Sequence, residues 1–252
     1  MSRQGRKISS TGIYHVMNKG VSNQIMFEDV TDCKYFLNLL KIYKKEYNIK
    51  IVAYCLMENH YHLLIIDKDC NISAFMQALQ SRYAEFFNFH HKRCGPLHNG
   101  RFQSEVVEND EYLLTVLRYI IQNPQKAGIS SYKDYKWSSY AEFFSNKNDC
   151  ISDVSYIKML FINQKEYISF IEKDSEDSCL EIKNKVFFGI MDEKAKKYIH
   201  KKFKVATCSA LRSFERLKRN RAIYKLRKYG LSIRQIERLT GISRGIVQSI
   251  AA

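Results

Sequence analysis

The chain has 252 residues, 45% of them hydrophobic, which predicts a globular protein with a sizeable core. It contains no run of about 18 apolar residues, which argues against a membrane-spanning helix. Seven cysteines are scattered without a Cys-x-x-Cys pair, and the basic start lacks the apolar run of a secretory signal. These features favour reduced thiols, no zinc knuckle and a cytoplasmic location.

The net charge of +15 is concentrated near the C-terminus. Residues 192–252 carry 17 Lys and Arg against 4 Asp and Glu, a net +13, which leaves +2 for residues 1–191. A segment this basic predicts a polyanionic partner, with nucleic acid as the first candidate. The alternative is a merely solvated basic surface, although such surfaces usually mix the two signs more evenly.

Strand and helix periodicities alternate through the first half of the chain. In chain order they predict strand 12–20, helix 29–47, strands 49–57 and 60–66, helix 71–90, strand 102–108 and helix 111–122. This order predicts an α+β fold, a ferredoxin-like βαββαβ antiparallel sheet with helices on one face and one extra helix. Pro124 should end the extra helix, because a proline disfavours the helical conformation of the residue before it. Residues 90–101, with three His, two Gly and a Pro, predict a solvated polar loop.

The strand signals fade after residue 145. Residues 146–205 are expected to form a helical connector with an acidic loop over 172–181. Residues 206–252 are predicted to form a basic all-α region that ends in a helix-turn-helix. Its predicted elements are a helix over 210–229, a helix over 232–240, a turn at Gly241 and a last helix capped by Ser243.

Two histidines stand two residues apart in the predicted strand 60–66. Because strand side chains alternate between faces, His60 and His62 share one face and Tyr61 takes the other. Two imidazoles about one pleat apart can bind a single metal ion. The pattern is short, so two half-exposed strand histidines without a metal remain an alternative. His15, in the first strand, is expected near the same place with a supporting or structural role.

The predicted helix 111–122 leads into a second informative pair. Tyr119 and Asn123 are four residues apart and share one helix face just before Pro124. A tyrosine hydroxyl can act as a covalent nucleophile once its proton is removed or its oxygen is polarised. An asparagine carbonyl oxygen can be a third, hard ligand to a metal held by two imidazoles. Since the chain has 17 tyrosines, Tyr119 could instead be an ordinary residue of an amphipathic helix.

Four blocks of the sequence resemble one family. Residues 53–64, 100–102, 118–124 and 137–140, in this order, look like the single-tyrosine HUH transposases, specifically the REP-associated tyrosine transposase branch. Residues 14–20 are similar to that family's first strand, so the likeness extends over about residues 11–142.

The sequence departs from the family pattern at two places. Glu58 stands where the family usually has proline, which should only loosen the turn between two strands. Gln125 and Lys126 replace the more usual Val-Arg and keep a basic residue in place.

The resemblance implies a nuclease and transposase domain over residues 1–145 that cleaves single-stranded DNA at or near hairpins. It implies that His60, His62 and Asn123 bind a divalent metal, Mg²⁺ or Mn²⁺, with zinc less suited, and that Tyr119 is the nucleophile. The cleaved strand would be held as a 5′-phosphotyrosine, which permits strand transfer. The expected partner is single-stranded or hairpin DNA and not a membrane, and a monomer is favoured over a homodimer.

Candidate DNA contacts lie in three regions. An N-terminal arm and the C-terminal helices would contact phosphates, the last helix would read bases, and a basic residue beside the site would stabilise charge on the phosphate. The candidates are Arg3, Arg6, Lys7, Lys19, Arg101, Lys126, Arg234, Ser243, Arg244 and Gln248.

Three functions follow as alternatives. The first is a metal-dependent single-stranded DNA endonuclease and strand transferase, favoured because all four active-site residues are present. The second is a catalytically idle hairpin-binding or transcription-regulatory protein. The third is a hydrolytic metalloenzyme for small substrates, which is disfavoured because Glu58 is the only carboxylate near the histidine pair in the sequence.

Overall fold

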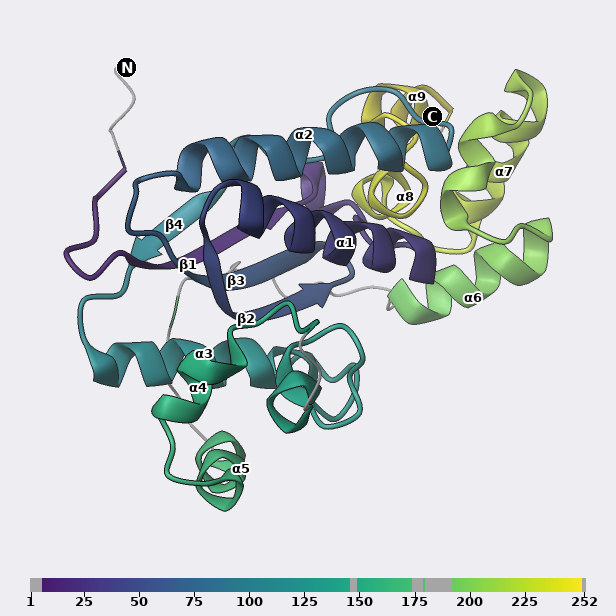
Figure 1. Ribbon diagram of the computed structural model, residues 1–252. Coiled ribbons are helices and arrows are strands. Elements are labelled where there is room, and N and C mark those ends of the chain that lie inside the picture. Colours follow the sequence, from purple (N-terminus) through teal and green to yellow (C-terminus); the bar gives the residue numbers. More distant parts are fainter. Residues whose placement is uncertain (1–5, 146–148, 174–178, 180–191, 251–252) are drawn as a thin grey trace.

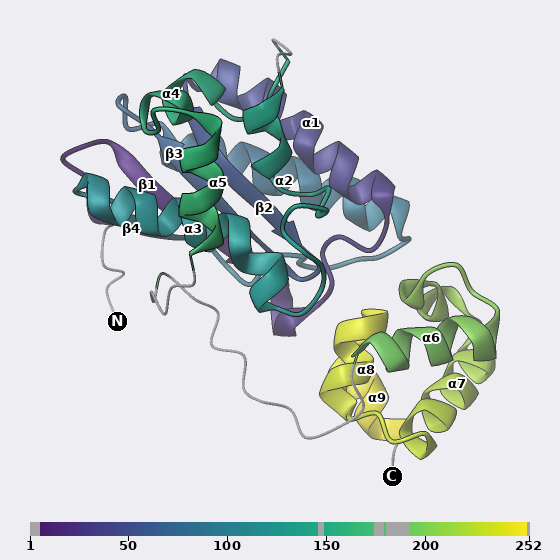
Figure 2. The ribbon, with the colours of Figure 1, turned by 90° about the horizontal axis from the view of Figure 1, so that it is seen from below.

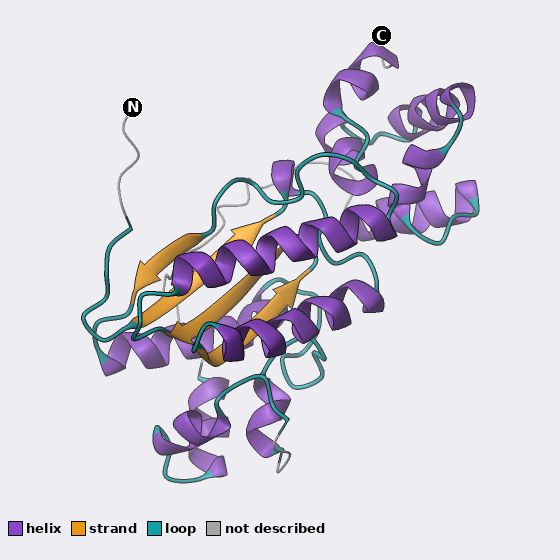
Figure 3. Cartoon of the chain, turned by 45° about the horizontal axis from the view of Figure 1, so that its top comes forward, coloured by secondary structure: helices purple, strands orange, loops and turns teal. Residues whose placement is uncertain are grey.

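The computed structural model describes residues 6–145, 149–173, 179 and 192–250 (Figures 1 and 3). Its strands are β1 (Ile13–Lys19), β2 (Lys50–Met57), β3 (His60–Ile66) and β4 (Gln103–Val106). Its α-helices are α1 (Val30–Glu46), α2 (Ile72–His90), α3 (Asp110–Lys126), α4 (Val154–Met159), α5 (Gln164–Glu172), α6 (Asp192–Phe203), α7 (Arg216–Lys228), α8 (Ile233–Thr240) and α9 (Arg244–Ile250). Short 3₁₀ helices are η1 (Val21–Asn23), η2 (Tyr140–Phe144) and η3 (Cys208–Ser213).

The four strands form one sheet in the order β2-β3-β1-β4, and each neighbouring pair is antiparallel. The predicted mixed α/β fold with an antiparallel sheet is confirmed. The pairing of β1 with β3 places Met17 opposite His62 and Lys19 opposite His60. It therefore brings the end of the first strand to the histidine pair.

Helices cover both faces of the sheet: the two helices of the predicted βαββαβ unit share one face, and the predicted extra helix lies on the other (Figure 1). Figure 1 shows α1 and α2 on one face and α3, α4 and α5 on the other. All seven residues of β3 and seven of the eight in β2 are buried, so neither face can be left to solvent. One apolar cluster joins Leu63 to α1 and α2, and a second joins Leu64 to α3.

Helix α3 continues past the expected stop at Pro124 and ends at Lys126. Asn109 caps its start by accepting a hydrogen bond from the Tyr112 N–H, and acidic residues fill the first turn. Pro124 lies in the last turn, where the helix loses only one backbone hydrogen bond. The Ala127 N–H still donates to the Asn123 carbonyl, so the turn that carries Asn123 keeps its helical geometry.

The C-terminal helices α6–α9 form their own apolar cluster beside the α/β part (Figure 2). The described part of that cluster includes Ala195 and Ile199 of α6 as well as residues of α7–α9, so α6 packs with the helices that follow it. Most of the acidic loop predicted over 172–181 lies outside the described residues. Among the described helices, none combines the length and apolar character needed to cross a bilayer.

The C-terminal unit contacts the sheet domain around the β2–β3 turn and the segment between η1 and α1. The Lys196 Nζ lies 2.5 Å from a carboxylate oxygen of Glu58, and the Ile25 side chain joins the C-terminal apolar cluster. The Ser209 N–H donates to the Glu28 carboxylate at 3.2 Å. The Glu58 carbonyl accepts from the N–H groups of Met26 and Phe27, so the turn that was expected to be loose is tied down.

The segment 90–101 is not a solvated loop, as the sequence suggested, because part of it is buried under long-range contacts. His91 is 6% exposed, and its Nε2 donates to Asp32 at 2.9 Å. Its Nδ1 faces Glu28 at 3.7 Å. Burial opposes the charge of His91, but the hydrogen bond and charge of Asp32 and the charges of Glu28 and Asp29 outweigh it, so the His91 pKa is raised.

The His91 ion pair should make stability depend on pH. The pKa of an unfolded histidine is about 6.5. Because the folded pKa is higher, the ion pair contributes its full stability below about pH 6.5 and loses it as the pH rises through the folded pKa. His91→Gln should lower the free energy of unfolding by about 1–3 kcal/mol at pH 6, and the difference should shrink at higher pH. Urea unfolding at pH 6 and at pH 9 measures this difference in the free energy of unfolding. His90→Gln, at a partly exposed neighbour, is the control, and an equal loss at pH 6 and pH 9 would contradict the charged state of His91.

Candidate active site

The histidine pair lies on the sheet face that α3 covers. His60 and His62 share this face with Leu64, which packs against the cluster that contains Tyr119. His60 is 9% exposed, His62 1% and Tyr119 6%. The alternation of side chains along β3, predicted from the sequence, thus points both imidazoles toward α3 and away from the α1–α2 face.

Each histidine of the pair has its Nδ1 engaged by a neighbour. The His60 Nδ1 lies 2.7 Å from the Asn59 Oδ1, and the His62 Nδ1 lies 3.0 Å from the Nε2 of His15. His15 is fully buried on the adjacent strand, and its ring stacks on that of His62 with centroids 5.2 Å apart. The supporting role expected for His15 is consistent with this contact.

Burial keeps the imidazoles uncharged. It lowers the His60 pKa to about 4; a hydrogen bond with Asn123 opposes this effect and the charge of Lys19 adds to it. The His62 pKa is also lowered, by burial first and then by the neighbouring His60 and His15. Neutral imidazoles at pH 7 keep a lone pair for a metal, since protonation would block it.

Helix α3 brings the other two candidate residues to the histidine pair. The Tyr119 ring lies edge-on to His62, with centroids 5.5 Å apart, and 6.0 Å from the ring of His15. The side chain of Asn123 hydrogen-bonds His60. Spacing of four residues on one helix face therefore aims Tyr119 at one histidine and Asn123 at the other.

The donor set at this place suits a divalent cation. Two neutral imidazoles and an amide oxygen converge there, and the Nδ1 atoms are already engaged, so each ring turns its Nε2 to any ion. Three protein donors would leave coordination positions open for oxygen atoms of a substrate. The residues fit the metal that the family resemblance implies.

Two of the three basic residues suggested for this site lie beside it. Lys19 pairs with His60 across β1 and β3 and lowers its pKa through its charge. The Lys126 Nζ lies 5.6 Å from the centroid of the Tyr119 ring. Arg101 is exposed and lies close enough to Arg6 to lower the Arg6 pKa, an effect to which burial contributes most.

The N-terminal arm is partly described. Arg3 lies outside the described residues. The Arg6 guanidinium stacks on Phe102 at 3.7 Å from the ring centroid and donates to the Phe102 carbonyl, while Lys7 is exposed. Arg6 is therefore fixed against the start of β4.

The C-terminal candidates are exposed but carry little charge. Arg234, Ser243, Arg244 and Gln248 all face solvent on α8 and α9 or at their ends. Gly241, with a left-handed φ of 67°, turns the chain between the two helices. The charge is concentrated on α7, whose 13 residues include seven Lys and Arg and no acid.

A second group of potential metal ligands was missed from the sequence. Asp29, Asp32, His90 and His91 bring ligand atoms within 4.8 Å of one another. These atoms already bond each other or cap α1: Asp29 accepts from two N–H groups of α1, and Asp32 accepts from the N–H of Glu28 and from His91. His90 pairs with Asp29, which lies 61 positions earlier in the chain, so no local pattern in the sequence predicts this group.

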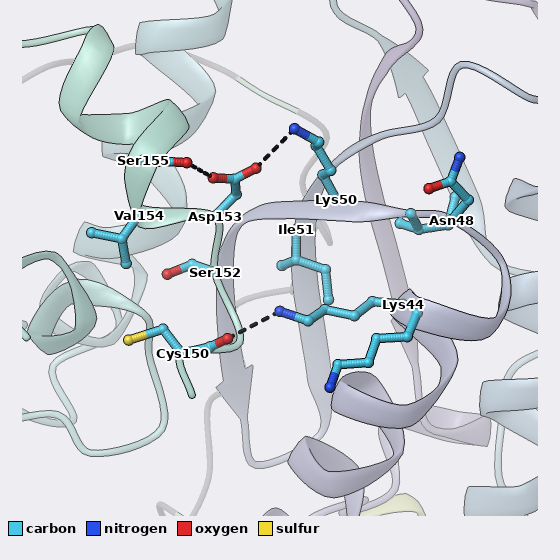
Figure 4. Close-up of a pocket in the computed structure, with 11 residues that line it drawn as sticks. Lys44, Asn48, Lys50, Ile51, Cys150, Ser152, Asp153, Val154 and Ser155 are labelled. Atoms are coloured by element: carbon cyan, nitrogen blue, oxygen red, sulfur yellow. Dashed lines mark hydrogen bonds and ion pairs between the residues drawn. The ribbon is translucent and has the colours of Figure 1, made fainter. Parts of the chain in front are cut away.

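A surface hollow at the opposite end of β2 lies away from this site (Figure 4). Lys50 lines it and pairs with Asp153 at 3.2 Å, and Lys44 donates to the carbonyls of Cys150 and Ile151. Met57, the partner of His60, lies seven positions after Lys50 in β2, which is roughly 23 Å along a strand. At this distance the hollow is too far from the histidine pair to take part in its chemistry.

Comparisons with known proteins match the part of the chain that contains this site. Residues 9–123 match the family model described as IS200-like transposase. No curated protein matched the chain. The matched segment includes β1 to β4 and α3 as far as Asn123, and with it all four candidate residues.

Among solved structures, the chain is similar to the REP-associated tyrosine transposase bound to a REP hairpin, at 17% identity and a TM-score of 0.49, over 61% of this chain and 93% of that one. It is also similar to a transposase-like protein from Deinococcus radiodurans R1, at 20% identity and a TM-score of 0.34, over 47% of this chain and 95% of that one. Through residues 9–123, this chain is therefore similar to the IS200-like transposases.

Proposed function

We propose that the protein is a metal-dependent single-stranded DNA endonuclease and strand transferase of the REP-associated tyrosine transposase branch. The observation that carries the proposal is that one chain brings Tyr119 to His62 and Asn123 to His60. The strand order β2-β3-β1-β4, with α1 and α2 on one face, supports a ferredoxin-like nuclease domain. We propose residues 1–145 as this domain.

His60, His62 and Asn123 would hold a divalent metal, Mg²⁺ or Mn²⁺. When bound, the metal supplies Lewis-acid polarisation of a non-bridging oxygen of the scissile phosphate. The chain's own residues orient this site: Asn59 and His15 fix the imidazole rings, and α3 fixes the distance of Tyr119 from them. Lys19 and Lys126, which lie beside the histidine pair and Tyr119, would offset the negative charge that builds on the phosphate.

Tyr119 is the nucleophile in this proposal. Its oxygen forms a bond to phosphorus as the bond to the 3′ oxygen breaks, and the tyrosine proton is balanced by the proton gained by the departing 3′-OH. The product is a 5′-phosphotyrosine. Because the phosphodiester energy is retained, another 3′-OH can attack the same phosphorus and release Tyr119, which joins strands without a nucleotide cofactor.

DNA hairpins are the proposed substrate, as the sequence resemblance implies. Arg6 and Lys7 of the arm and Arg101 would contact the backbone near the site. Residues 146–205 are proposed as a connector and 206–252 as a basic helix-turn-helix region, with Ser243, Arg244 and Gln248 of α9 as base contacts.

The solvent face of α7 offers most of the phosphate contacts of the C-terminal region. Arg221, Lys225 and Lys228 are exposed there, while Ala222 and Ile223 pack into the C-terminal apolar cluster. Helices α8 and α9 carry only Arg234, Arg238 and Arg244, and Arg238 is paired with Asp192. A catalytically idle DNA-binding protein is the second candidate function, and this surface is the observation that favours it.

A covalent-adduct assay separates the two functions. Incubation with single-stranded hairpin DNA and Mn²⁺ should give a protein–DNA species that survives SDS, and Tyr119→Phe should abolish it. Tyr132→Phe is the matched control, since Tyr132 is buried in the same apolar cluster as Tyr119. An adduct that persists in Tyr119→Phe, or no adduct on a panel of hairpins, would favour the idle DNA-binding protein.

The basic face of α7 should dominate DNA affinity. In the Tyr119→Phe background, Arg221→Glu with Lys225→Glu should weaken DNA binding by about tenfold or more at low salt and reduce the slope of log K against log salt by roughly 2. Fluorescence anisotropy over a salt series measures both quantities. Lys165→Glu, an exposed charge on α5, should change little. If the α7 variant binds like the control, the charge on α7 is merely solvated.

A further inference from the structure

We infer that Glu105 and His15 are positioning residues that fix which nitrogen of His62 carries the proton. They form a line from the edge of the sheet, Glu105 to His15 to His62, that leaves the His62 Nε2 free of hydrogen and turned to the metal. The inference rests on the proposed function, because it assigns a purpose to these residues only if His62 is a metal ligand.

His15 is the first link. It extends from β1 beside β3 and is fully buried, with its Nε2 3.0 Å from the His62 Nδ1. The rings stack with an angle of 30° between their planes. A distance of 3.0 Å between two ring nitrogens means that one donates a proton and the other accepts it.

Glu105 is the second link. It lies opposite His15 in the β1–β4 pairing, and its Oε2 is 4.0 Å from the His15 Nδ1. That Nδ1 is buried and has no hydrogen-bond partner among the described residues. The same Oε2 accepts from the Tyr112 hydroxyl at 2.6 Å, so the first turn of α3 holds the carboxylate in place.

The carboxylate decides the direction of the hydrogen bond. A negative charge near the His15 Nδ1 favours the tautomer with hydrogen on that atom, which leaves the His15 Nε2 as an acceptor. His62 must then donate from its Nδ1 and keep a lone pair on Nε2. The opposite direction would place hydrogen on the His62 Nε2, the atom that the metal needs.

His60 shows why His62 requires a longer line of residues. The His60 Nδ1 faces the Asn59 Oδ1 at 2.7 Å, and a carbonyl oxygen only accepts, so one neighbour fixes that tautomer. The neighbour of His62 is a histidine, which can accept or donate. Only a further group can remove this ambiguity, and Glu105 is the charged group that faces the far nitrogen of His15.

Two measurements on the full chain test the inference. Long-range ¹H–¹⁵N NMR spectra of the metal-free protein report the tautomer of each histidine. Titration with Co²⁺ alone, followed by its visible absorbance, gives the metal affinity. Wild-type His62 should be an Nδ1–H tautomer, and Glu105→Gln should give a mixture of tautomers and weaken Co²⁺ binding by about tenfold. His15→Phe, which removes the acceptor, should weaken it by about tenfold to a hundredfold.

The controls separate failure of the inference from failure of the proposed function. Glu111→Gln removes an exposed carboxylate from the first turn of α3 and should leave both measurements unchanged. His60→Ala should abolish Co²⁺ binding. If the wild-type chain binds Co²⁺ but Glu105→Gln and His15→Phe leave the His62 tautomer and the Co²⁺ affinity unchanged, the positioning role of Glu105 and His15 is overturned and the proposed metal site stands. If the wild-type protein binds no Co²⁺, the proposed metal site fails, and the positioning role of Glu105 and His15 fails with it.

Discussion

The packing of α3 against the histidine face of the sheet is the constraint on which this structure depends. A strand period of two places His60 and His62 on one face, and a helix spacing of four places Tyr119 and Asn123 on one face. Chemistry between them requires those two faces to meet. They meet because apolar residues surround the polar ones on both sides, with Leu64 on the sheet and Leu117 on the helix in one buried cluster.

That packing buries the histidine side chains, which then need hydrogen-bond partners. A polar group inside an apolar seam must find a hydrogen-bond partner, because leaving it unsatisfied costs about 1–3 kcal/mol. His60 finds Asn59 and Asn123, and His62 finds His15. Burial in the same seam lowers the pKa of each histidine of the pair, which keeps its ring neutral. Rigid orientation and a free lone pair thus have one physical origin.

The sequence was informative where the signal is periodic and local. The four strands, α1, α2 and the shared faces of His60 with His62 and Tyr119 with Asn123 follow from short-range patterns, and the structure contains them. The ion pair of His91 with Asp32 joins residues 59 positions apart, and the facing of Glu105 and His15 depends on strand register. Contacts of this kind leave no periodic trace.

Two predictions failed because a local rule met a tertiary constraint. Pro124 did not stop α3, since the packed last turn tolerates the loss of one hydrogen bond. The segment 90–101 is not a solvated loop, since His91 is buried and hydrogen-bonded to Asp32. In each case tertiary packing outweighed the local preference.

The central claim is that a single chain supplies both the nucleophile and the metal ligands. Mixing two defective variants tests it most directly: Tyr119→Phe, which keeps the ligands, and His60→Ala with His62→Ala, which keeps the tyrosine. The account predicts that the mixture forms no more SDS-stable adduct with hairpin DNA than either variant alone. Recovery of adduct in the mixture would contradict it, because Tyr119 of one chain would then be working with the histidines of another.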